Sequence, residues 1–347
     1  MTKVTIDDVA ESAGVSIKTV SRVVNHEPNV RETTRARVEA AISKLNYRPN
    51  VSARNLASQR SHLVGLIYDD PSHYEIPSAG YVISMQLGAL RACRTADHEL
   101  LIHPCNYRDR HIARELKALI EHARPVGIVL AAPLSNMPKI VKAIEATGTP
   151  FVRISPGGDS SRQYAVVTND REISAEMTRY LASLGHQRIA FIKGHPSHKA
   201  VANRYLGYLD GLEQSRLKLR KSLVEDGDNS FDSGEAAGLR LLRRKTRPTA
   251  IYAANDDMAA GVIRAAGLLG IDVPGQVSVA GCDDIALARQ ICPTLTTIRQ
   301  PLATMAEKAA LRLIGNADKK SQPRGSEVVP ASLRIRESTG PAPRQDG

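Results

Sequence analysis

The sequence predicts an α/β protein in which an N-terminal helix-turn-helix unit of three helices precedes a two-lobed, doubly wound core. Three observations predict this fold. Two short amphipathic helical patterns, separated by a glycine, open the chain. Behind them, short β-branched and leucine-rich runs alternate with longer helical stretches, and they do so in two sets. The length of 347 residues suits about two domains.

The helix-turn-helix is predicted from local signals in the first residues. Thr5 and Asp8 have the spacing of a capping box, so the first helix begins beside them. Gly14 can adopt a positive φ and ends that helix. Ser16 can cap a second helix. A third helix is expected over residues 32–45, and we assign residues 1–49 to this domain.

The second helix carries the side chains expected to face DNA, because in this fold its N-terminal end enters the major groove. The planar guanidinium of Arg22 can read a guanine through two hydrogen bonds. Hydroxyl and amide side chains suit phosphates, which position a protein on DNA. We expect base contacts from Ile17, Lys18, Ser21 and Arg22, and phosphate contacts from Ser16, Thr19 and Asn25. The alternative is a generic three-helix bundle with solvated Lys and Arg side chains.

Residues 50–61 are predicted to form a linker that holds a short basic helix. Pro49 breaks the preceding helix, and Asn50 can cap a new one. Arg54 and the apolar Leu56 give this helix the composition of a minor-groove wedge. An ordinary linker is the alternative.

The remaining chain alternates strands and helices, which predicts parallel sheets. Buried strands are expected at 63–68, 99–103, 126–131 and 151–154, and again at 189–193, 250–254 and 277–280. Two sets of strands predict two lobes.

A ligand site is expected in the cleft between the lobes, because ligands of such sheets bind at the carboxyl ends of the strands. Sugar hydroxyls require donors and acceptors on a fixed frame, with an aromatic or apolar floor. The loops at these ends supply such groups. The candidate effector-binding residues are Asp69, Tyr74, Ser155, Arg204, Phe231, Asn255 and Asp283.

Several classes of protein do not fit the sequence. It holds no GxGxxG, no GxxxxGK[ST] and no Cys or His cluster at metal spacing, so we expect no cofactor and no metal. It shows no apolar signal segment and no membrane-length apolar run, so we expect a cytoplasmic protein without membrane contact. The net charge of +11 indicates a polyanionic partner. The neighbouring pairs Asp256-Asp257 and Asp283-Asp284 leave open a sugar-processing enzyme, although adjacent carboxylates diverge. We therefore expect no catalytic residue.

Dense motifs resemble the lactose-repressor/galactose-repressor family of bacterial transcription regulators. They are VAESAGVSIKTVSRVVN, LNYRPN, LASLGHQRIAFIKG, NRYLGYLDGL, AANDDMAAGVIRAAGLLGIDVPGQVSVAGCDD and PTLTTIRQ. The resemblance runs from Thr5 to about Glu337. It implies a core like that of periplasmic binding proteins over 62–340, with one lobe near 62–164 and 298–327, the other near 165–294 and 328–340, and a tail at 341–347.

The resemblance also implies roles for individual residues. Arg204, Asn255 and Asp283 match effector contacts, Tyr47 matches a DNA-backbone contact, and Leu56 matches the residue inserted at the centre of a near-palindromic operator. Arg31 departs from the small polar cap usual at the third helix.

The expected function is that of a homodimeric repressor, released from its operator by a mono- or oligosaccharide. A purine or nucleoside effector is the alternative. The absence of Trp and the three Phe leave few stacking platforms, which favours a sugar.

Overall fold

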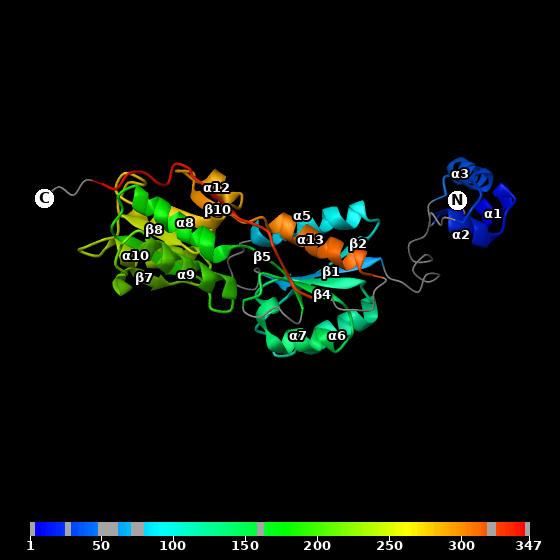
Figure 1. The fold of residues 1–347 in the computed structure, drawn as a ribbon, viewed down its shortest axis with the longest axis horizontal. Helices are drawn as coiled ribbons and strands as arrows, with labels where there is room; N and C mark the ends of the chain where they lie inside the picture. The colour runs from blue at the N-terminus through cyan, green and yellow to red at the C-terminus, as the bar shows by residue number, and fades with distance from the viewer. Residues whose placement is uncertain are drawn as a thin grey trace. The chain divides into compact units, whose positions relative to one another are not determined.

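The chain forms two compact units, Met1–Ser61 and His62–Gly347 (Figure 1). The computed structural model describes residues 4–24, 29–47, 62–70, 80–157, 163–317 and 324–343. Asn25, Tyr74 and the predicted hinge segment, with Arg54 and Leu56, lie outside these residues. Within them, no helix has both the length and the apolar character needed to cross a membrane.

The first unit contains the three helices that the sequence predicts, α1 (Ile6–Ala13), α2 (Ile17–Val24) and α3 (Glu32–Leu45). The predicted capping box is present: the Thr5 hydroxyl accepts from the Asp8 amide, and the Asp8 carboxylate accepts from the Thr5 amide. Gly14 ends α1 at φ 61°. Arg31 precedes α3 without a side-chain cap, so the departure noted in the sequence leaves that helix uncapped. The buried core joins all three helices.

The second unit contains two lobes, each built on a six-stranded sheet. In lobe 1 the strand order is β11-β5-β4-β3-β1-β2, and all pairs are parallel. Its strands are β1 (Leu63–Asp69), β2 (Glu99–Cys105), β3 (Gly127–Leu130), β4 (Phe151–Ile154), β5 (Tyr164–Val167) and β11 (Ser326–Val328). Helices α5 (Gly80–Thr95) and α13 (Leu302–Gly315) cover one face, and α6 (Ile112–Ala123) and α7 (Pro138–Glu145) cover the other.

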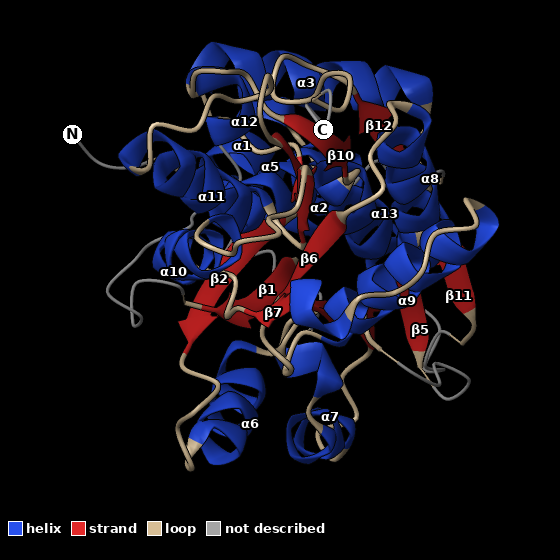
Figure 2. Cartoon of the chain, turned by 90° about the vertical axis from the view of Figure 1, so that its left-hand side faces the viewer, coloured by secondary structure: helices blue, strands red, loops and turns tan. Residues whose placement is uncertain are grey.

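In lobe 2 the strand order is β12-β10-β9-β8-β6-β7, and only β12 is antiparallel to its neighbour. Its strands are β6 (Ile189–Lys193), β7 (Val224–Asp226), β8 (Ala250–Ala253), β9 (Ser278–Asp283), β10 (Thr296–Arg299) and β12 (Ser332–Arg334). The helices are α8 (Asp170–Ser183), α9 (Lys199–Gln214), α10 (Phe231–Leu242), α11 (Asp256–Leu268) and the short α12 (Leu287–Gln290). Helices lie on both sides of the strands (Figure 2).

Strand pairing places the lobe boundaries a few residues from the approximate ones expected from the sequence. Strand β5 pairs with β4, so the chain leaves lobe 1 after Val167 and not after residue 164. Strand β10 pairs with β9, so lobe 2 extends to Arg299 and not to residue 294. The last crossing follows β11, which ends at Val328 rather than at residue 327. Strands β5, β10 and β11 are only three or four residues long and carry no clear strand pattern, so their pairing partners, and not their composition, set the boundaries.

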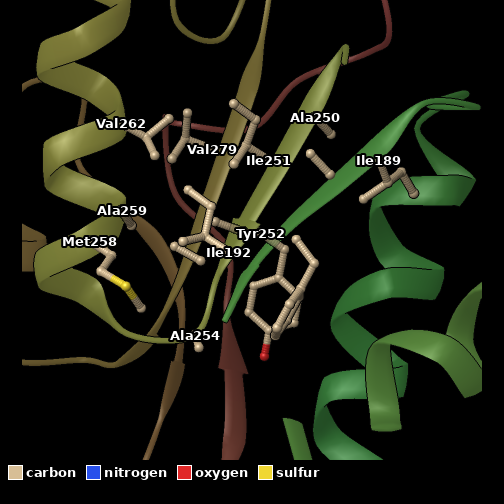
Figure 3. Close-up of a cluster of buried hydrophobic side chains, with 14 of the residues drawn as sticks. Ile189, Ile192, Ala250, Ile251, Tyr252, Ala254, Met258, Ala259, Val262 and Val279 are labelled. Carbon is tan, nitrogen blue, oxygen red and sulfur yellow. The ribbon is translucent and has the colours of Figure 1, made fainter. Parts of the chain in front are cut away.

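The strands of lobe 2 are apolar because helices cover both faces of its sheet. Met258, Ala259 and Val262 of α11 face Ile251 and Val279 of the sheet (Figure 3). Tyr252 turns to the other face, and its hydroxyl lies 2.9 Å from the Ser174 hydroxyl of α8. Both faces of the sheet are therefore buried, and alternate side chains serve opposite helix layers.

Candidate functional site

The N-terminal end of α2 presents the residues predicted to contact DNA. Ile17, Lys18 and Arg22 are exposed, and the Ile17 side chain is 47% exposed although it is apolar. An exposed isoleucine beside two cations is typical of a surface that meets a thymine methyl and base edges. Ser21 is half-buried on the same helix.

The predicted phosphate contacts also have a structural role. The Ser16 hydroxyl accepts from the Thr19 amide at 3.2 Å, and the two hydroxyl oxygens lie 2.9 Å apart. This pair caps α2 and holds its first turn. Tyr47 follows α3 and packs partly buried against the core of the unit.

A cavity of about 250 Å³ lies in the second unit between the lobes. Both lobes line it at the carboxyl ends of their strands, as predicted for doubly wound sheets. Lobe 1 contributes Tyr68, Asp69, Tyr81, Val82, Met85, Tyr107, Arg108, Ala132 and Ser155. Lobe 2 contributes His195, His198, Ala200, Val201, Arg204, Asp228, Asn229, Ser230, Asn255, Asp283 and Gln300.

Arg204 is the buried centre of the lobe 2 wall. Its Nε donates to Asp170 Oδ1 at 2.9 Å, and its Nη2 lies 3.6 Å from Asp283 Oδ1. Burial raises the pKa of Asp283, and the Arg204 guanidinium opposes this shift. Gln300 Nε2 donates to Asp283 Oδ1 at 2.9 Å. The guanidinium and the carboxylate are thus fixed before any ligand binds, which reduces the cost of binding.

Asn255 reaches the cavity wall while capping a helix. Its Oδ1 accepts from the Met258 amide at 3.1 Å at the start of α11, and its Nδ2 donates to the Asn229 carbonyl at 2.8 Å. Asn255, and not the neighbouring Asp256, is therefore the cap of α11. Asp256 is fully buried and accepts from the Ile285 amide at 3.0 Å.

Ser155 carries an unusual hydroxyl. The residue is 6% exposed and adopts φ 46°, and its Oγ is buried without a hydrogen-bond partner among the residues that the structure describes. An unpaired buried hydroxyl costs free energy, on the order of 1–3 kcal/mol. Its place in the cavity wall makes it a candidate for a bond to a ligand.

The structure brings Asp69, Ser155, Arg204, Asn255 and Asp283 together in one cavity, as the sequence predicts. Asp69 Oδ1 also accepts from the Tyr107 amide at 3.0 Å, which fixes the loop after β2. Phe231 is not among the lining residues, because it is the first residue of α10 and lies partly buried outside the cavity wall. The prediction that it binds the effector is therefore not supported by its position.

Sequence reasoning missed several cavity residues. Tyr107 and Arg108 follow β2 directly, and Gln300 follows β10, so strand ends could have identified them. Tyr81 comes from the first turn of α5, where no strand end points to it. The tyrosine rings supply stacking surfaces, so the expected scarcity of aromatic platforms does not hold inside the cavity.

Two histidines, His195 and His198, line the lobe 2 side of the cavity, and their surroundings favour the neutral imidazole. Burial, with the added repulsion of nearby His195 and Arg204, lowers the pKa of His198 to about 4. Burial also lowers the pKa of His195. A neutral imidazole offers one donor and one acceptor. The His195 Nε2 lies 3.5 Å from the Tyr107 hydroxyl, so a contact joins the two lobes beside the cavity.

The fold and the cavity define a two-lobed ligand-binding protein that carries a helix-turn-helix unit. Two family profiles match the chain: "Bacterial regulatory proteins, lacI family" over residues 5–50, and "Periplasmic binding protein-like domain" over residues 178–339. The chain is 34% identical over 337 residues to the HTH-type transcriptional regulator GalR of Escherichia coli (strain K12), covering 96% of this chain and 95% of that protein. It is 33% identical over 349 residues to the transcriptional repressor PurR of Yersinia enterocolitica, covering 99% and 98%.

Solved structures agree with these relatives. A lac repressor dimer bound to operator and the anti-inducer ONPF has a TM-score of 0.80 at 28% identity, covering 98% of this chain and 100% of that one. A complex of the regulator CelR with cellobiose has a TM-score of 0.74 at 27% identity, covering 97% and 100%. The chain belongs to the lacI family of bacterial regulatory proteins, and it is a DNA-binding transcriptional regulator with an effector-binding core.

Proposed function

We propose that the protein is a homodimeric repressor that binds a near-palindromic operator and is released when a mono- or oligosaccharide occupies the cavity. It acts in the cytoplasm, where the operator lies. The cavity carries this proposal: an orphan Ser155 hydroxyl, a fixed Arg204–Asp283 pair and tyrosine rings meet at one place. Such a set suits a polyhydroxylated ring, which needs donors, acceptors and an apolar floor.

The DNA contacts proposed for the first unit follow the exposure of α2. Ile17, Lys18, Ser21 and Arg22 read bases, and Ser16, Thr19, Asn25 and Tyr47 contact the backbone. Arg54 and Leu56 enter the minor groove at the centre of the operator. The operator-bound lac repressor dimer supports this arrangement by similarity.

The effector contacts proposed for the core are Asp69, Ser155, Arg204, Asn255 and Asp283, with Tyr74 kept from the sequence analysis. The CelR–cellobiose complex supports a sugar by similarity. A purine or nucleoside remains the second candidate, because the chain is also similar to PurR and Tyr81 and Tyr107 could stack on a base.

We infer that the effector binds without being converted. A glycosidase needs a carboxylic acid and a second carboxylate on opposite sides of the scissile bond. Asp256 is occupied by the Ile285 amide and the Thr297 hydroxyl, and Asp284 is held by Arg299 and Arg336. These engagements support a binding role for the cavity rather than hydrolysis.

A thermal-shift screen tests the effector class. The purified protein is heated with mono- and oligosaccharides, sugar phosphates, nucleosides and purines. A ligand at about 100 times its dissociation constant stabilises the folded state by about 2.7 kcal/mol. A sugar that raises the melting temperature supports the proposal, whereas a response to purines alone selects the second candidate.

Ser155→Ala identifies the cavity as the site of the screened sugar. The change removes a hydroxyl that has no partner in the described part of the chain, so folding stability should stay equal or rise slightly. We expect affinity for that sugar to fall about tenfold. Ser135→Ala is the matched control, because the Ser135 hydroxyl donates to the Ile154 carbonyl outside the cavity wall. Equal affinities in the two variants would move the sugar to another site.

Ser155 is a better test than Arg204. Removing Arg204 would leave Asp170 and Asp283 buried without their cation, which costs about 3–5 kcal/mol and can unfold lobe 2.

Release from DNA is tested separately. Selection from a random duplex library yields the operator, and the screened sugar is then titrated into the operator complex. We expect operator affinity to fall by about 5- to 150-fold. A sugar that tightens the complex would show co-repression instead of induction.

A further inference from the structure

The loops that enter the lobe 2 sheet gather at the end opposite the cavity. Strands β6, β7 and β8 are parallel and adjacent, in the order β8-β6-β7. The cavity residues follow their carboxyl ends, so the segments that precede these strands lie together at the other end. Arg188 Nε, before β6, donates to the carbonyl of Arg247, before β8, at 3.0 Å.

These loops and the end of α10 carry a cluster of cations, which we name the basic end of lobe 2. Its exposed members are Arg216, Lys218, Arg220, Lys221, Arg240, Arg243, Arg244 and Lys245. Figure 1 places β7 and α10, which border it, side by side in this lobe. Two ion pairs link the two segments: Glu225 of β7 pairs with Arg240 at 2.8 Å and with Arg244 at 2.9 Å.

The basic end holds far more positive charge than its own carboxylates balance. Glu225 serves two guanidinium groups at once. In the part of the chain that the structure describes, the remaining members of the basic end form no ion pair. The C-terminal dipole of α10 accounts for cations near Arg240, and that of α9, which ends at Gln214, accounts for Arg216. Lys218, Arg220 and Lys221 lie beyond the last turn of α9. Such a concentration of like charge calls for an anionic partner.

The composition of the surface distinguishes among anionic partners. Protein interfaces depend on desolvated aromatic and apolar anchors. Among the described residues of the basic end, Leu219, 41% exposed, is the one large exposed apolar side chain, and a single leucine does not make an apolar anchor cluster. An array of Arg and Lys side chains with so little apolar surface suits a phosphate backbone, which carries one charge per about 1.7 Å of duplex.

We infer that the basic end of lobe 2 binds the phosphate backbone of duplex DNA without reading its sequence. This contact is separate from that of α2 and goes beyond the proposed function, which uses only the first unit on DNA. A regulator with two DNA-binding surfaces holds more tightly to bulk DNA and can join two duplex segments.

The test compares salt dependence in full-length variants. Lys218→Gln, Lys221→Gln, Arg243→Gln and Lys245→Gln are combined in one variant. Binding to a labelled duplex of random sequence is followed by fluorescence anisotropy from about 50 to 200 mM NaCl. Each lost phosphate contact lowers the slope of log affinity against log salt by about 0.9, so we expect a decrease of about 2 to 4.

A matched variant controls for net charge. It carries Arg114→Gln, Lys117→Gln, Lys139→Gln and Lys142→Gln on α6 and α7 of lobe 1, and all four side chains are exposed. Both variants lose the same charge and keep α2, so a diffuse effect of net charge would change both slopes equally. Thermal unfolding of each variant verifies that the core remains folded.

The outcomes are decisive. A smaller slope in the lobe 2 variant than in the control supports the inference. Equal slopes overturn it. Poly-L-glutamate serves as a probe for an acidic protein. If the salt slopes are equal, and poly-L-glutamate binds the unmodified protein and the control variant but binds the lobe 2 variant more weakly, the partner is an acidic protein instead. Loss of sugar response would leave this result unaffected, so the two proposals fail separately.

Discussion

The buried carboxyl group of Asp256 makes the stability of the folded protein depend on pH. It is fully buried behind the cavity, and burial raises its pKa to about 7. The Thr297 hydroxyl and the Ile285 amide donate to it and partly oppose the shift. The unfolded chain releases this proton near its ordinary pKa of 3.8. The folded state therefore loses stability as pH rises from about 4 to about 7, and the loss is complete above that range.

Asp256→Asn should remove this pH dependence. The amide oxygen can still accept from the Ile285 amide, and the amide nitrogen can donate to the Thr297 hydroxyl. We expect a higher melting temperature than that of the unmodified protein at pH 8 and a smaller difference at pH 5. Melting curves across this range measure it. Asp226→Asn, at an exposed side chain of β7, serves as control and should leave the profile unchanged.

Substitution of a single residue, Arg22, tests the predicted DNA-binding surface. Arg22→Ala should cost about 1–3 kcal/mol in operator affinity and relax preference at one base pair of each half-site. Arg37→Ala removes an exposed arginine from α3 and serves as control. Anisotropy with the selected operator and with single-base variants measures both effects. A uniform loss on every sequence would instead assign Arg22 to the backbone.

Features that depend on residues close together in the sequence could be predicted, whereas features that depend on distant residues could not. The capping box of α1 and the glycine at its end depend on neighbours within a few residues, so the sequence predicts them. The apolar runs of β4 and β6 predict these strands over their observed ranges for the same reason. Strand β10 contains Thr296 and Thr297, which are buried only because lobe 2 surrounds them. Their polar side chains conceal the strand.

The cavity could be predicted only in part for a related reason. Asp69 ends β1 and Asn255 comes just after β8, and both strands are apolar, so topology places these residues at the cleft. Tyr81 reaches the same cavity from the first turn of a helix, which only the packing of α5 decides. Ser155 was predicted by position, whereas its unpaired hydroxyl required the surrounding structure to be seen.

Helix α5 supports the proposed dimer at the scale of an element. Its inner face packs on the lobe 1 sheet and α13, whereas Ile83 and Leu87, one turn apart, are 49% and 48% exposed. Ile102 on the edge strand β2 is 43% exposed. Exposed apolar side chains on neighbouring elements are typical of a surface that another chain covers.

Leu87→Asp should convert the dimer to a monomer. A buried, unpaired carboxylate at a subunit interface costs several kcal/mol, whereas at an exposed site it costs little. Leu206→Asp is the control, because Leu206 is 39% exposed on α9 of lobe 2. Sedimentation velocity distinguishes the species. If both variants sediment as the unmodified protein does, α5 lies outside the interface.

At the scale of the whole molecule, the two compact units have unequal cores. The core of the first unit consists of the few buried side chains that α1, α2 and α3 share. The core of the second unit includes large clusters in both lobes. A small unit buries a smaller fraction of its surface and is only marginally stable, so the two units should unfold at different temperatures.

Calorimetry should therefore resolve two transitions, with the first unit melting at the lower temperature. A sugar that binds in the cavity stabilises only the state in which the core is folded, so it should raise the upper transition and leave the lower one in place. The operator should do the reverse, because it binds the first unit. A single transition that both ligands shift equally would mean that the two units unfold together. In that case the sugar and the operator would affect each other's binding through the common unfolding equilibrium as well as through the arrangement of the lobes.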